Sequence, residues 1–324
     1  MIPSNEILRK VNLALEALPY NRQPASLYEP IRYALSMGGK RIRPVLMLMS
    51  YNLFKDHPED IMMQALGLET YHNYTLLHDD LMDKADVRRG HPTVHKRWND
   101  NMAILSGDAM LVLAYQYMSQ CDPIHLPHVL RLFNETALEV GEGQQFDMDF
   151  ENRTDVAEGE YIEMIRLKTS VLLACALKTG ALLADASADD AERLYKVGEQ
   201  IGLAFQLQDD LLDVYGDPEV FGKAIGGDIT SNKKTYMLIN ALNRSDARQR
   251  RELTRWINAR DFDRQEKIAA VTRIYDEIGI RELCEAKINY YFMEGQKYLD
   301  QVSIPEERKS QLRQYIAEMM HREK

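Results

Sequence analysis

Cysteine is scarce in this sequence. Cys121, Cys175 and Cys284 are the only cysteines among its 324 residues, and they lie far apart. Disulfide frameworks and cysteine-ligated zinc sites use paired or closely spaced cysteines, so neither is predicted. The simplest interpretation is a protein of the reducing cytoplasm.

Long apolar runs and an excess of positive charge are also missing. No segment of about 18 or more residues lacks charged side chains, so a membrane span is not predicted. The first stretch, MIPSNEILRKVNLALEALPYN, includes Glu6, Arg9 and Lys10, so it does not have the apolar run of a secretion signal. The net charge of −10 argues against nucleic acid as a partner.

Apolar material is plentiful, because hydrophobic residues make up 45% of the chain and charged residues 28%. This is enough for one large core or for two domains of ordinary size. No stretch rich in Gly, Ser or Pro has the length of a linker, and no low-complexity tract occurs. We therefore predict a single domain over residues 1–324.

Apolar residues recur at helical spacing along most of the chain, with steps of three and four that are clear at 61–72. Alternating β-branched runs are scarce, so few strands are expected and the predicted fold is all-α. The predicted helices span residues 41–54, 60–85, 99–119, 126–150, 159–183, 188–215, 233–242, 262–297 and 304–321.

One short pattern occurs twice. HDDLMD at 78–83 and QDDLLD at 208–213 each lie near the C-terminal end of a predicted apolar helix. A basic stretch with glycine follows each of them, at 88–90 and at 222–223.

In each copy, the first and last aspartates are four residues apart and so share a helix face, with the middle one about 100° round. Three acids among apolar residues, at the negative end of a helix dipole, are costly without a cation. Mg²⁺ takes oxygen ligands and shares carboxylates with substrate phosphates. One such motif alone is equally typical of a solvated helix end, but two favour a metal site. The predicted metal ligands are Asp79, Asp80, Asp83, Asp209, Asp210 and Asp213.

Basic residues accompany the acids. GGKRIRP at 38–44 places three cations at the start of a predicted helix, where amide N–H groups favour an anion. Arg88 and Arg89 can hold phosphate oxygens in fork geometry. Each cluster alone is typical of a solvated surface, but beside paired acids in an acidic chain it indicates a diphosphate site.

These motifs, in this order, resemble those of the trans-isoprenyl diphosphate synthases (the polyprenyl synthetases, including farnesyl and geranylgeranyl diphosphate synthases). The resemblance covers nearly the whole chain. It implies a single-domain helical bundle with a central cavity, a homodimer, and three Mg²⁺ ions per active site. The matching segments are GGKRIRP at 38–44, HDDLMDKADVRRGHPTVH at 78–95, GQQFD at 143–147, KTS at 168–170, FQLQDDLLDVYGDPEVFGK at 205–223, GD at 227–228 and NK at 232–233.

The resemblance also implies roles for single residues. Asp79, Asp83 and Asp209 would ligate the Mg²⁺ ions that hold an allylic diphosphate, and the other three aspartates would support them. The residues that contact or line the site of this diphosphate would be Arg88, Gln144, Asp147, Lys168, Gln206, Lys223 and Lys233. Those that hold isopentenyl diphosphate would be Gly39, Lys40, Arg43, His72 and Arg89. For His72, a partnered core histidine is the alternative.

The activity that the resemblance implies needs no nucleophilic side chain. Metal ions and cations stabilise the departing diphosphate, an allylic cation forms, and the double bond of isopentenyl diphosphate attacks it. A proton then leaves, taken by the released diphosphate, while Thr169 and Gln206 stabilise the cation through their dipoles. We expect the loops at 84–95 and 216–232 to close and exclude water.

The resemblance also implies that the growing product runs along the helix that carries Asp79, so that this helix sets product length. One helical turn rises about 5.4 Å, close to the length of an isoprene unit, so residues four, five and eight before Asp79 would form the floor. They are Thr75, Tyr74 and Tyr71. The resemblance favours geranylgeranyl diphosphate, then farnesyl diphosphate, with Tyr74 as the limiting residue. The alternative is that both tyrosines are only core aromatics.

Two other functions fit parts of the pattern. A class I terpene cyclase shares the first DDxxD motif, but has no use for GGKRIRP. A non-catalytic helical subunit would modulate a partner synthase, but such a subunit is expected to have lost some of the six aspartates.

Overall fold

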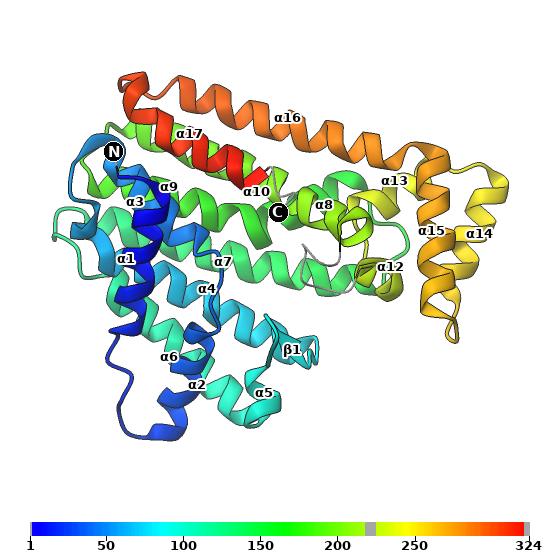
Figure 1. Ribbon diagram of the computed structural model, residues 1–324, viewed down its shortest axis with the longest axis horizontal. Coiled ribbons are helices and arrows are strands. Elements are labelled where there is room, and N and C mark those ends of the chain that lie inside the picture. Colours follow the sequence, from blue (N-terminus) through cyan, green and yellow to red (C-terminus); the bar gives the residue numbers. More distant parts are fainter. Residues whose placement is uncertain (1, 218–224, 321–324) are drawn as a thin grey trace. The chain divides into compact units, whose positions relative to one another are not determined.

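The computed structural model describes residues 2–217 and 225–320 (Figure 1). Its regular structure is helical, apart from a hairpin of β1 (Val87–Arg88) and β2 (His91–Pro92), the only sheet in the part of the chain that is described. The predicted all-α fold is confirmed. None of its described helices combines the length and apolarity that crossing a membrane requires.

Two compact units can be distinguished. The first unit comprises Met1–Asn134, Cys175–Tyr195 and Val302–Tyr315, and the second comprises Glu135–Ala174, Lys196–Gln301 and Ile316–Lys324. Neither unit is a continuous stretch of sequence. The single domain over 1–324 stays a prediction.

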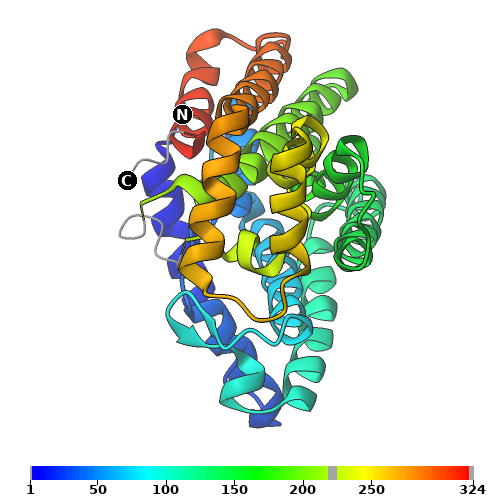
Figure 2. The ribbon, with the colours of Figure 1, turned by 90° about the vertical axis from the view of Figure 1, so that its right-hand side faces the viewer.

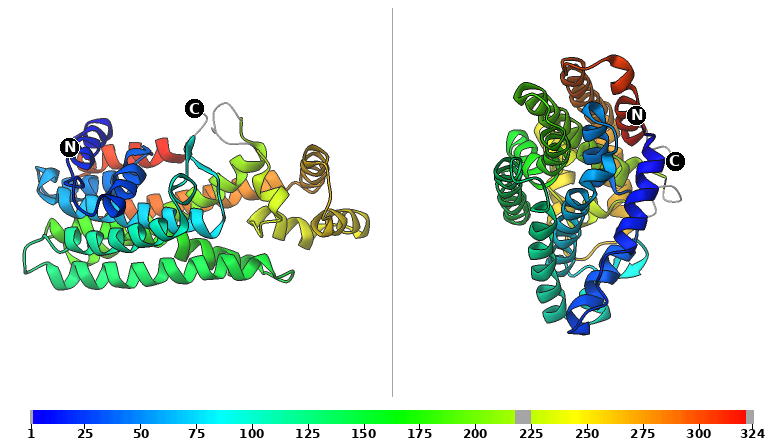
Figure 3. Two further views of the ribbon diagram at one scale, coloured as in Figure 1. Left: turned by 90° about the horizontal axis from the view of Figure 1, so that it is seen from below. Right: turned by 90° about the vertical axis from the view of Figure 1, so that its left-hand side faces the viewer.

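In the first unit, α4 carries the first aspartate motif at its C-terminal end. Its residues from Gln64 to Tyr71 are all buried, as expected for a central helix surrounded by others. It packs along α6, and the two helices run side by side (Figure 3). The elements that lie wholly in this unit are α1 (Ser4–Glu16), α2 (Ala25–Ser36), α3 (Ile42–Phe54), the 3₁₀ turn η1 (Pro58–Ile61), α4 (Met62–Met82), β1, β2, α5 (Val94–Arg97) and α6 (Asp100–Met118).

Four helices contain a boundary between the units: α7 (Leu126–Glu151), α9 (Val171–Leu183), α10 (Ala188–Tyr215) and α17 (Glu306–Met320). In the second unit, α14 and α15 pack side by side (Figure 2). The elements that lie wholly in this unit are α8 (Glu158–Ile165), the π-helical segment η2 (Arg166–Ser170), α12 (Gly227–Ser231), α13 (Tyr236–Arg244), α14 (Ala247–Asn258), α15 (Arg264–Ile278) and α16 (Ile280–Asp300).

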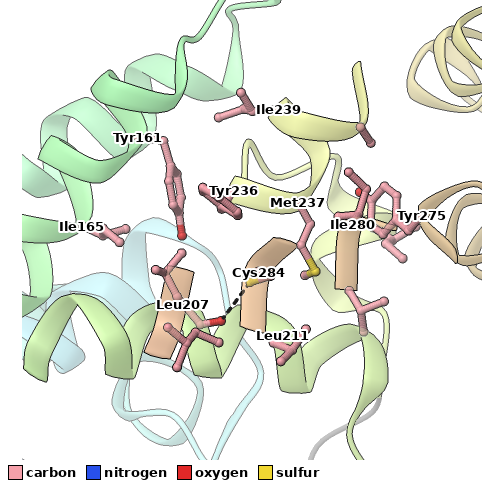
Figure 4. Packing of buried hydrophobic residues seen from close by; sticks show 14 of the residues in the cluster. Tyr161, Ile165, Leu207, Leu211, Tyr236, Met237, Ile239, Tyr275, Ile280 and Cys284 are labelled. Carbon is pink, nitrogen blue, oxygen red and sulfur yellow. Dashed lines mark hydrogen bonds between the residues drawn. The ribbon is translucent and has the colours of Figure 1, made fainter. Parts of the chain in front are cut away.

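The core of the second unit lies against α10. Leu207 and Leu211 of α10 are buried together with Tyr161, Tyr236 and Cys284 (Figure 4). The thiol of Cys284 lies 3.9 Å from the backbone oxygen of Leu207. All three cysteines of the chain are free thiols, and the cytoplasmic location stays a prediction.

Most predicted helices are present, with some corrections. The single helix predicted at 262–297 was wrong: α15 ends and α16 begins at Gly279, whose φ of 75° breaks the helical path. The helix predicted at 159–183 contains a π-helical segment. The loop expected at 216–232 includes the short helix α12, and its residues 218–224 lie outside the described part.

Helices α1, α2 and α14 were not predicted. Helix α2 contains Pro30, which removes a backbone donor and weakens a helical pattern. Helix α14 has one buried residue, Leu253, among several arginines, so its apolar periodicity is weak.

Candidate active site

The first aspartate motif occupies the C-terminal turn of α4. Asp80 is buried, Asp79 is half-buried and Asp83 is exposed. The amide of Asp83 donates to the backbone oxygen of Asp79 at 2.9 Å, so helical geometry continues to the end of the motif. The middle aspartate therefore points in a different direction around the helix from the other two, as expected.

Arg88 of β1 holds the buried aspartate. Its Nε lies 2.8 Å from both carboxylate oxygens of Asp80, and its Nη2 lies 2.7 Å from Oδ1. The same Nη2 is 3.8 Å from Oδ2 of Asp79. Burial raises the pKa of Asp80, although the hydrogen bond and charge of Arg88 act in the opposite direction. This ion pair fixes the hairpin to the end of α4.

Arg89 brings the hairpin to the glycines before α3. Its Nη1 donates to the backbone oxygen of Gly38. A Cβ atom on Gly39, whose φ is 127°, would lie 2.7 Å from the guanidinium of Arg89. The backbone conformation therefore favours glycine at position 39, and any other residue there would also displace the Arg89 guanidinium. Lys40 follows in this loop and is exposed.

His72 of α4 lies beside Arg43 and Arg89, which together with Lys40 we call the cationic group. Nη1 of Arg43 lies 3.0 Å from Nε2 of His72. Because a guanidinium only donates, Nε2 must be the acceptor and the imidazole is neutral. Burial lowers the pKa of His72, and the charges of Arg43 and Arg89 lower it further.

The second aspartate motif, on α10, repeats the arrangement of the first. Asp210 is buried, while Asp209 and Asp213 are half-buried. Asp210 accepts hydrogen bonds from the hydroxyl of Tyr161 and, at 3.0 Å, from Nε2 of Gln206. Burial raises the pKa of Asp210 to about 7, despite the opposing charge of Lys233 and these hydrogen bonds.

Asp213 joins α10 to the segment that carries Lys233. The amide of Asp228, in α12, donates to Oδ2 of Asp213 at 2.9 Å. The amide of Lys233 in turn donates to the backbone oxygen of Asp228 at 2.9 Å. The second motif is thereby linked by hydrogen bonds to Lys233, which the resemblance places at the diphosphate site.

The π-helical segment presents Lys168 and Thr169. Nζ of Lys168 lies 2.7 Å from Oδ2 of Asp147, on α7. The hydroxyl of Thr169 donates to Oε1 of Gln206, on α10, at 3.0 Å. Such single π-helical turns are frequent at functional sites.

Two glycines allow α7 and α10 to approach this segment. A Cβ atom on Gly143 would lie 2.3 Å from the amide nitrogen of Lys168, and one on Gly202 would lie 2.5 Å from Cα of Ser170. Each glycine is four residues before a polar partner, Asp147 or Gln206, and so lies one turn away on the same face. Close backbone contact therefore brings these side chains within hydrogen-bonding distance.

Asp147 is ionised beside its lysine partners. Burial raises its pKa, but the charges of Lys233 and Lys168 outweigh this effect and lower it below its ordinary value. Gln144 lies nearly one turn earlier on α7 and is half-buried.

The residues predicted to limit product length lie in an aromatic cluster in the first unit. Tyr71 is buried, with its ring centroid 5.5 Å from that of Tyr74 and 5.3 Å from that of Phe133. Tyr74 is half-buried and its ring lies 4.9 Å from that of His78. The hydroxyl of Thr75 donates to the backbone oxygen of His72 within α4.

Within each unit, most predicted site residues lie together. Lys223 lies outside the described residues, and closure of the two loops stays a prediction. Sequence reasoning missed Tyr161, Gly202 and Phe133. A glycine four residues before Gln206, matching the spacing of Gly143 and Asp147, was an available signal for Gly202. Nothing local indicates the partner of Tyr161, because that contact depends on packing.

The acids fit a cation that needs few protein ligands. Among residues 2–217 and 225–320, no group of three or more His, Cys, Asp or Glu side chains is gathered for metal binding. Protein donors occupy Asp80 and Asp210, and the flanking aspartates lie at less buried positions. Mg²⁺ fits this arrangement, because it commonly keeps several waters and uses one or two carboxylates together with phosphate oxygens.

Asp210→Asn tests the buried carboxyl. A raised pKa in the folded state means that the folded protein binds this proton more tightly than the unfolded chain, so stability falls as pH rises. We expect the free energy of unfolding of the original protein, relative to Asp210→Asn, to fall between about pH 4 and about pH 7 in metal-free buffer. Urea titrations at several pH values measure this difference. A difference independent of pH would contradict the prediction. Asp86→Asn is the control of opposite sign, because Lys96 lowers the pKa of Asp86 and its contribution should rise with pH.

Known proteins resemble this chain over most of its length. The family model described as polyprenyl synthetase matches residues 24–275. A short chain isoprenyl diphosphate synthase of Methanocaldococcus jannaschii is 41% identical over 254 residues, which cover 78% of this chain and 77% of that protein. A geranylgeranyl diphosphate synthase of Methanosarcina mazei is 38% identical over 290 residues, covering 88% and 86%.

The solved structures agree with the sequence comparisons. A crystal structure of a geranylgeranyl pyrophosphate synthase superposes with a TM-score of 0.95, at 41% identity and with 100% of both chains covered. The two aspartate motifs, their basic partners and this similarity over the full length lead to one conclusion. The chain belongs to the polyprenyl synthetase family and is a short-chain prenyltransferase.

Proposed function

We propose that this prenyltransferase condenses isopentenyl diphosphate with an allylic diphosphate to make geranylgeranyl diphosphate. The observation that carries this proposal is the aromatic cluster on α4, in which half-buried Tyr74 lies five residues before Asp79 above buried Tyr71. A single aromatic at the nearer positions, with Thr75 beside it, favours this product. Farnesyl diphosphate is the second candidate, because the ring of Tyr74 is an aromatic at one of the two nearer positions and could stop the chain earlier.

The aspartates would hold Mg²⁺ and, through it, the allylic diphosphate. Asp79, Asp83 and Asp209 are the proposed ligands of three ions, with Asp80, Asp210 and Asp213 in support. When bound, Mg²⁺ supplies positive charge that stabilises the departing diphosphate. The hydrogen bonds from Arg88 to Asp80, and from Tyr161 to Asp210, support this division of roles.

Cationic side chains would also bind the allylic diphosphate, and side-chain dipoles would stabilise the allylic cation. Arg88, Lys168, Lys223 and Lys233 would neutralise the allylic diphosphate, with Asp147 and Gln144 lining its site. The oxygens of Thr169 and Gln206 would stabilise the allylic cation, and the released diphosphate would accept the proton. The ordered contacts of Lys168 with Asp147, and of Thr169 with Gln206, support this preorganised arrangement.

Isopentenyl diphosphate would bind at the cationic group of the first unit. Its proposed ligands are the amide of Gly39 and the side chains of Lys40, Arg43, His72 and Arg89. The contacts between Arg43 and His72, and between Arg89 and Gly38, support a common anion site.

A homodimer is also proposed. On α6, Leu105 and Val112 are 60% and 58% exposed, and Ile104 is 43% exposed. Leu105 and Val112 are seven residues apart and so lie on the same face of the helix. An exposed apolar stripe of this kind fits a contact with a second copy of the chain.

Removing the metal tests the proposed cofactor. We expect a chelator to abolish turnover of isopentenyl and farnesyl diphosphates, and added Mg²⁺ to restore it. Asp79→Asn and Asp83→Asn should each lower kcat by about a hundredfold or more, because they weaken charge stabilisation of the leaving group. Diphosphate release measures the rate. Asp86→Asn, three residues after Asp83 and outside the DDxxD motif, is the matched control, and equal losses in all three variants would contradict the assignment.

Tyr74→Ala tests the control of product length. Removal of the ring opens about one helical turn of depth, close to one isoprene unit, so products longer than those of the original protein are expected. Chromatography of the dephosphorylated products measures their lengths. Exposed Tyr290→Ala is the control. An unchanged product distribution in Tyr74→Ala would show that Tyr74 is only a core aromatic.

The double variant Leu105→Glu/Val112→Glu tests the interface. Charges on this stripe should be tolerated in a single chain but not in a desolvated contact, so the variant is expected to sediment as a monomer. Met293→Glu introduces the same charge on α16, at a residue that is 47% exposed, and should not change the mass. A double variant that keeps the mass of the original dimer would rule out α6 as the contact.

A further inference from the structure

The three cations of GGKRIRP are not equivalent in the structure. Arg41 is 5% exposed, whereas Lys40 is exposed and Arg43 is half-buried. Arg41 precedes α3 with φ 48° and ψ 35°, the left-handed conformation that side chains rarely adopt. This backbone conformation occurs at the residue that is buried, while the cations on either side of it in the motif, Lys40 and Arg43, are exposed or half-buried.

Each nitrogen of the Arg41 guanidinium has an acceptor. Nη1 lies 2.7 Å from Oε1 of Glu69, and Nη2 donates to the backbone oxygen of Leu35 at 2.5 Å. Nε makes a longer contact of 3.4 Å with Oδ1 of Asn12. The side chains of Arg41 and Glu69 are 3% and 2% exposed. With these contacts made, the guanidinium has little means of reaching a substrate.

Glu69 is itself held in place. Nδ2 of Asn73 donates to Oε1 of Glu69 at 3.1 Å and to its backbone oxygen at 2.8 Å. Asn73 is 3% exposed, so the part of this network formed by Arg41, Glu69 and Asn73 is buried. Fully satisfied buried networks give a site one geometry, although a buried ion pair contributes little net stability.

The network lies beside the cationic group. Glu69 is three residues before His72 on α4, so the two side chains lie on neighbouring parts of one face. Arg41 reaches Glu69 while Arg43 reaches His72, which ties the start of α3 to α4 at two points. The charge of Glu69 also opposes the repulsion that Arg41 exerts on Arg89.

We propose that Arg41 and Glu69 are positioning residues for isopentenyl diphosphate. Arg41 does not touch the substrate. Its ion pair sets the loop at 38–43 against α4, so that Arg43, His72 and Arg89 converge on one diphosphate. The inference rests on the proposed binding of isopentenyl diphosphate at this group.

Glu69→Gln distinguishes positioning from direct contact. If Arg41 bound the substrate directly, this change would release its guanidinium and remove a nearby negative charge. KM for isopentenyl diphosphate would then stay the same or fall. Positioning gives the opposite sign, because the ion pair that orients the loop is weakened. We expect KM for isopentenyl diphosphate to rise about tenfold, and KM for the allylic diphosphate to change by less than about twofold. An unchanged or lower KM for isopentenyl diphosphate would overturn the proposal.

Arg41→Met, Arg41→Lys and the double variant Arg41→Met/Glu69→Met complete the test. Arg41→Met should raise the same KM, and Arg41→Lys should recover part of the loss by restoring charge. The double variant guards against misfolding, because apolar replacement of both partners is often tolerated where loss of one is not. It should show cooperative unfolding yet keep the raised KM. A double variant with the original KM would overturn the proposal.

Calorimetric titration with isopentenyl diphosphate separates this inference from the proposed function. If the original protein binds isopentenyl diphosphate but makes no product, the proposed reaction fails, and weaker binding by Glu69→Gln still supports positioning. If binding by Glu69→Gln equals that of the original protein, positioning fails whatever the reaction is.

Discussion

Each aspartate motif depends on one buried carboxylate that protein groups hold. Arg88 binds Asp80 through both carboxylate oxygens, and Tyr161 and Gln206 donate to Asp210. Because the middle residue of each motif faces inward, helical geometry directs the first and last aspartates elsewhere. These outer acids are less buried than the middle one, and Asp79 also lies 3.8 Å from Arg88. Loss of the inward contact would therefore disturb the end of the helix that carries all three acids.

In the second unit, close backbone approach also fixes the positions of site side chains. Gly143 and Gly202 bring α7 and α10 against the π-helical segment, and the polar side chains one turn later meet Lys168 and Thr169. The neighbouring core includes Tyr161, so apolar packing also places the hydroxyl that holds Asp210. Core packing therefore determines the geometry of the site. A larger residue at either glycine would move the polar side chains away from Lys168 or Thr169.

Burying these charged groups lowers the stability of the folded protein, and bound ligands of opposite charge would restore it. Burial raises the pKa of Asp80 and Asp210, and it lowers the pKa of His72 and Arg89. In each case the largest cause is burial, which disfavours the charged form of the carboxyls and the protonated form of the bases. Cations bound by the acids, and anions bound by the arginines, would stabilise the folded state by mass action.

Much of this protein could be predicted from its sequence, because helical periodicity, the four-residue spacing of acids and the order of motifs are local properties. They indicated the all-α fold, the two aspartate motifs and their basic companions, and a prenyltransferase. The tertiary structure alone decided that Arg41 is buried on Glu69, that Tyr161 binds Asp210, and that residues 166–170 form a π-helix. It also decided that the helix predicted at 262–297 breaks at Gly279. Three neighbouring cations look alike in a sequence, and what separates them is the partner that each finds on another helix, which local spacing does not encode.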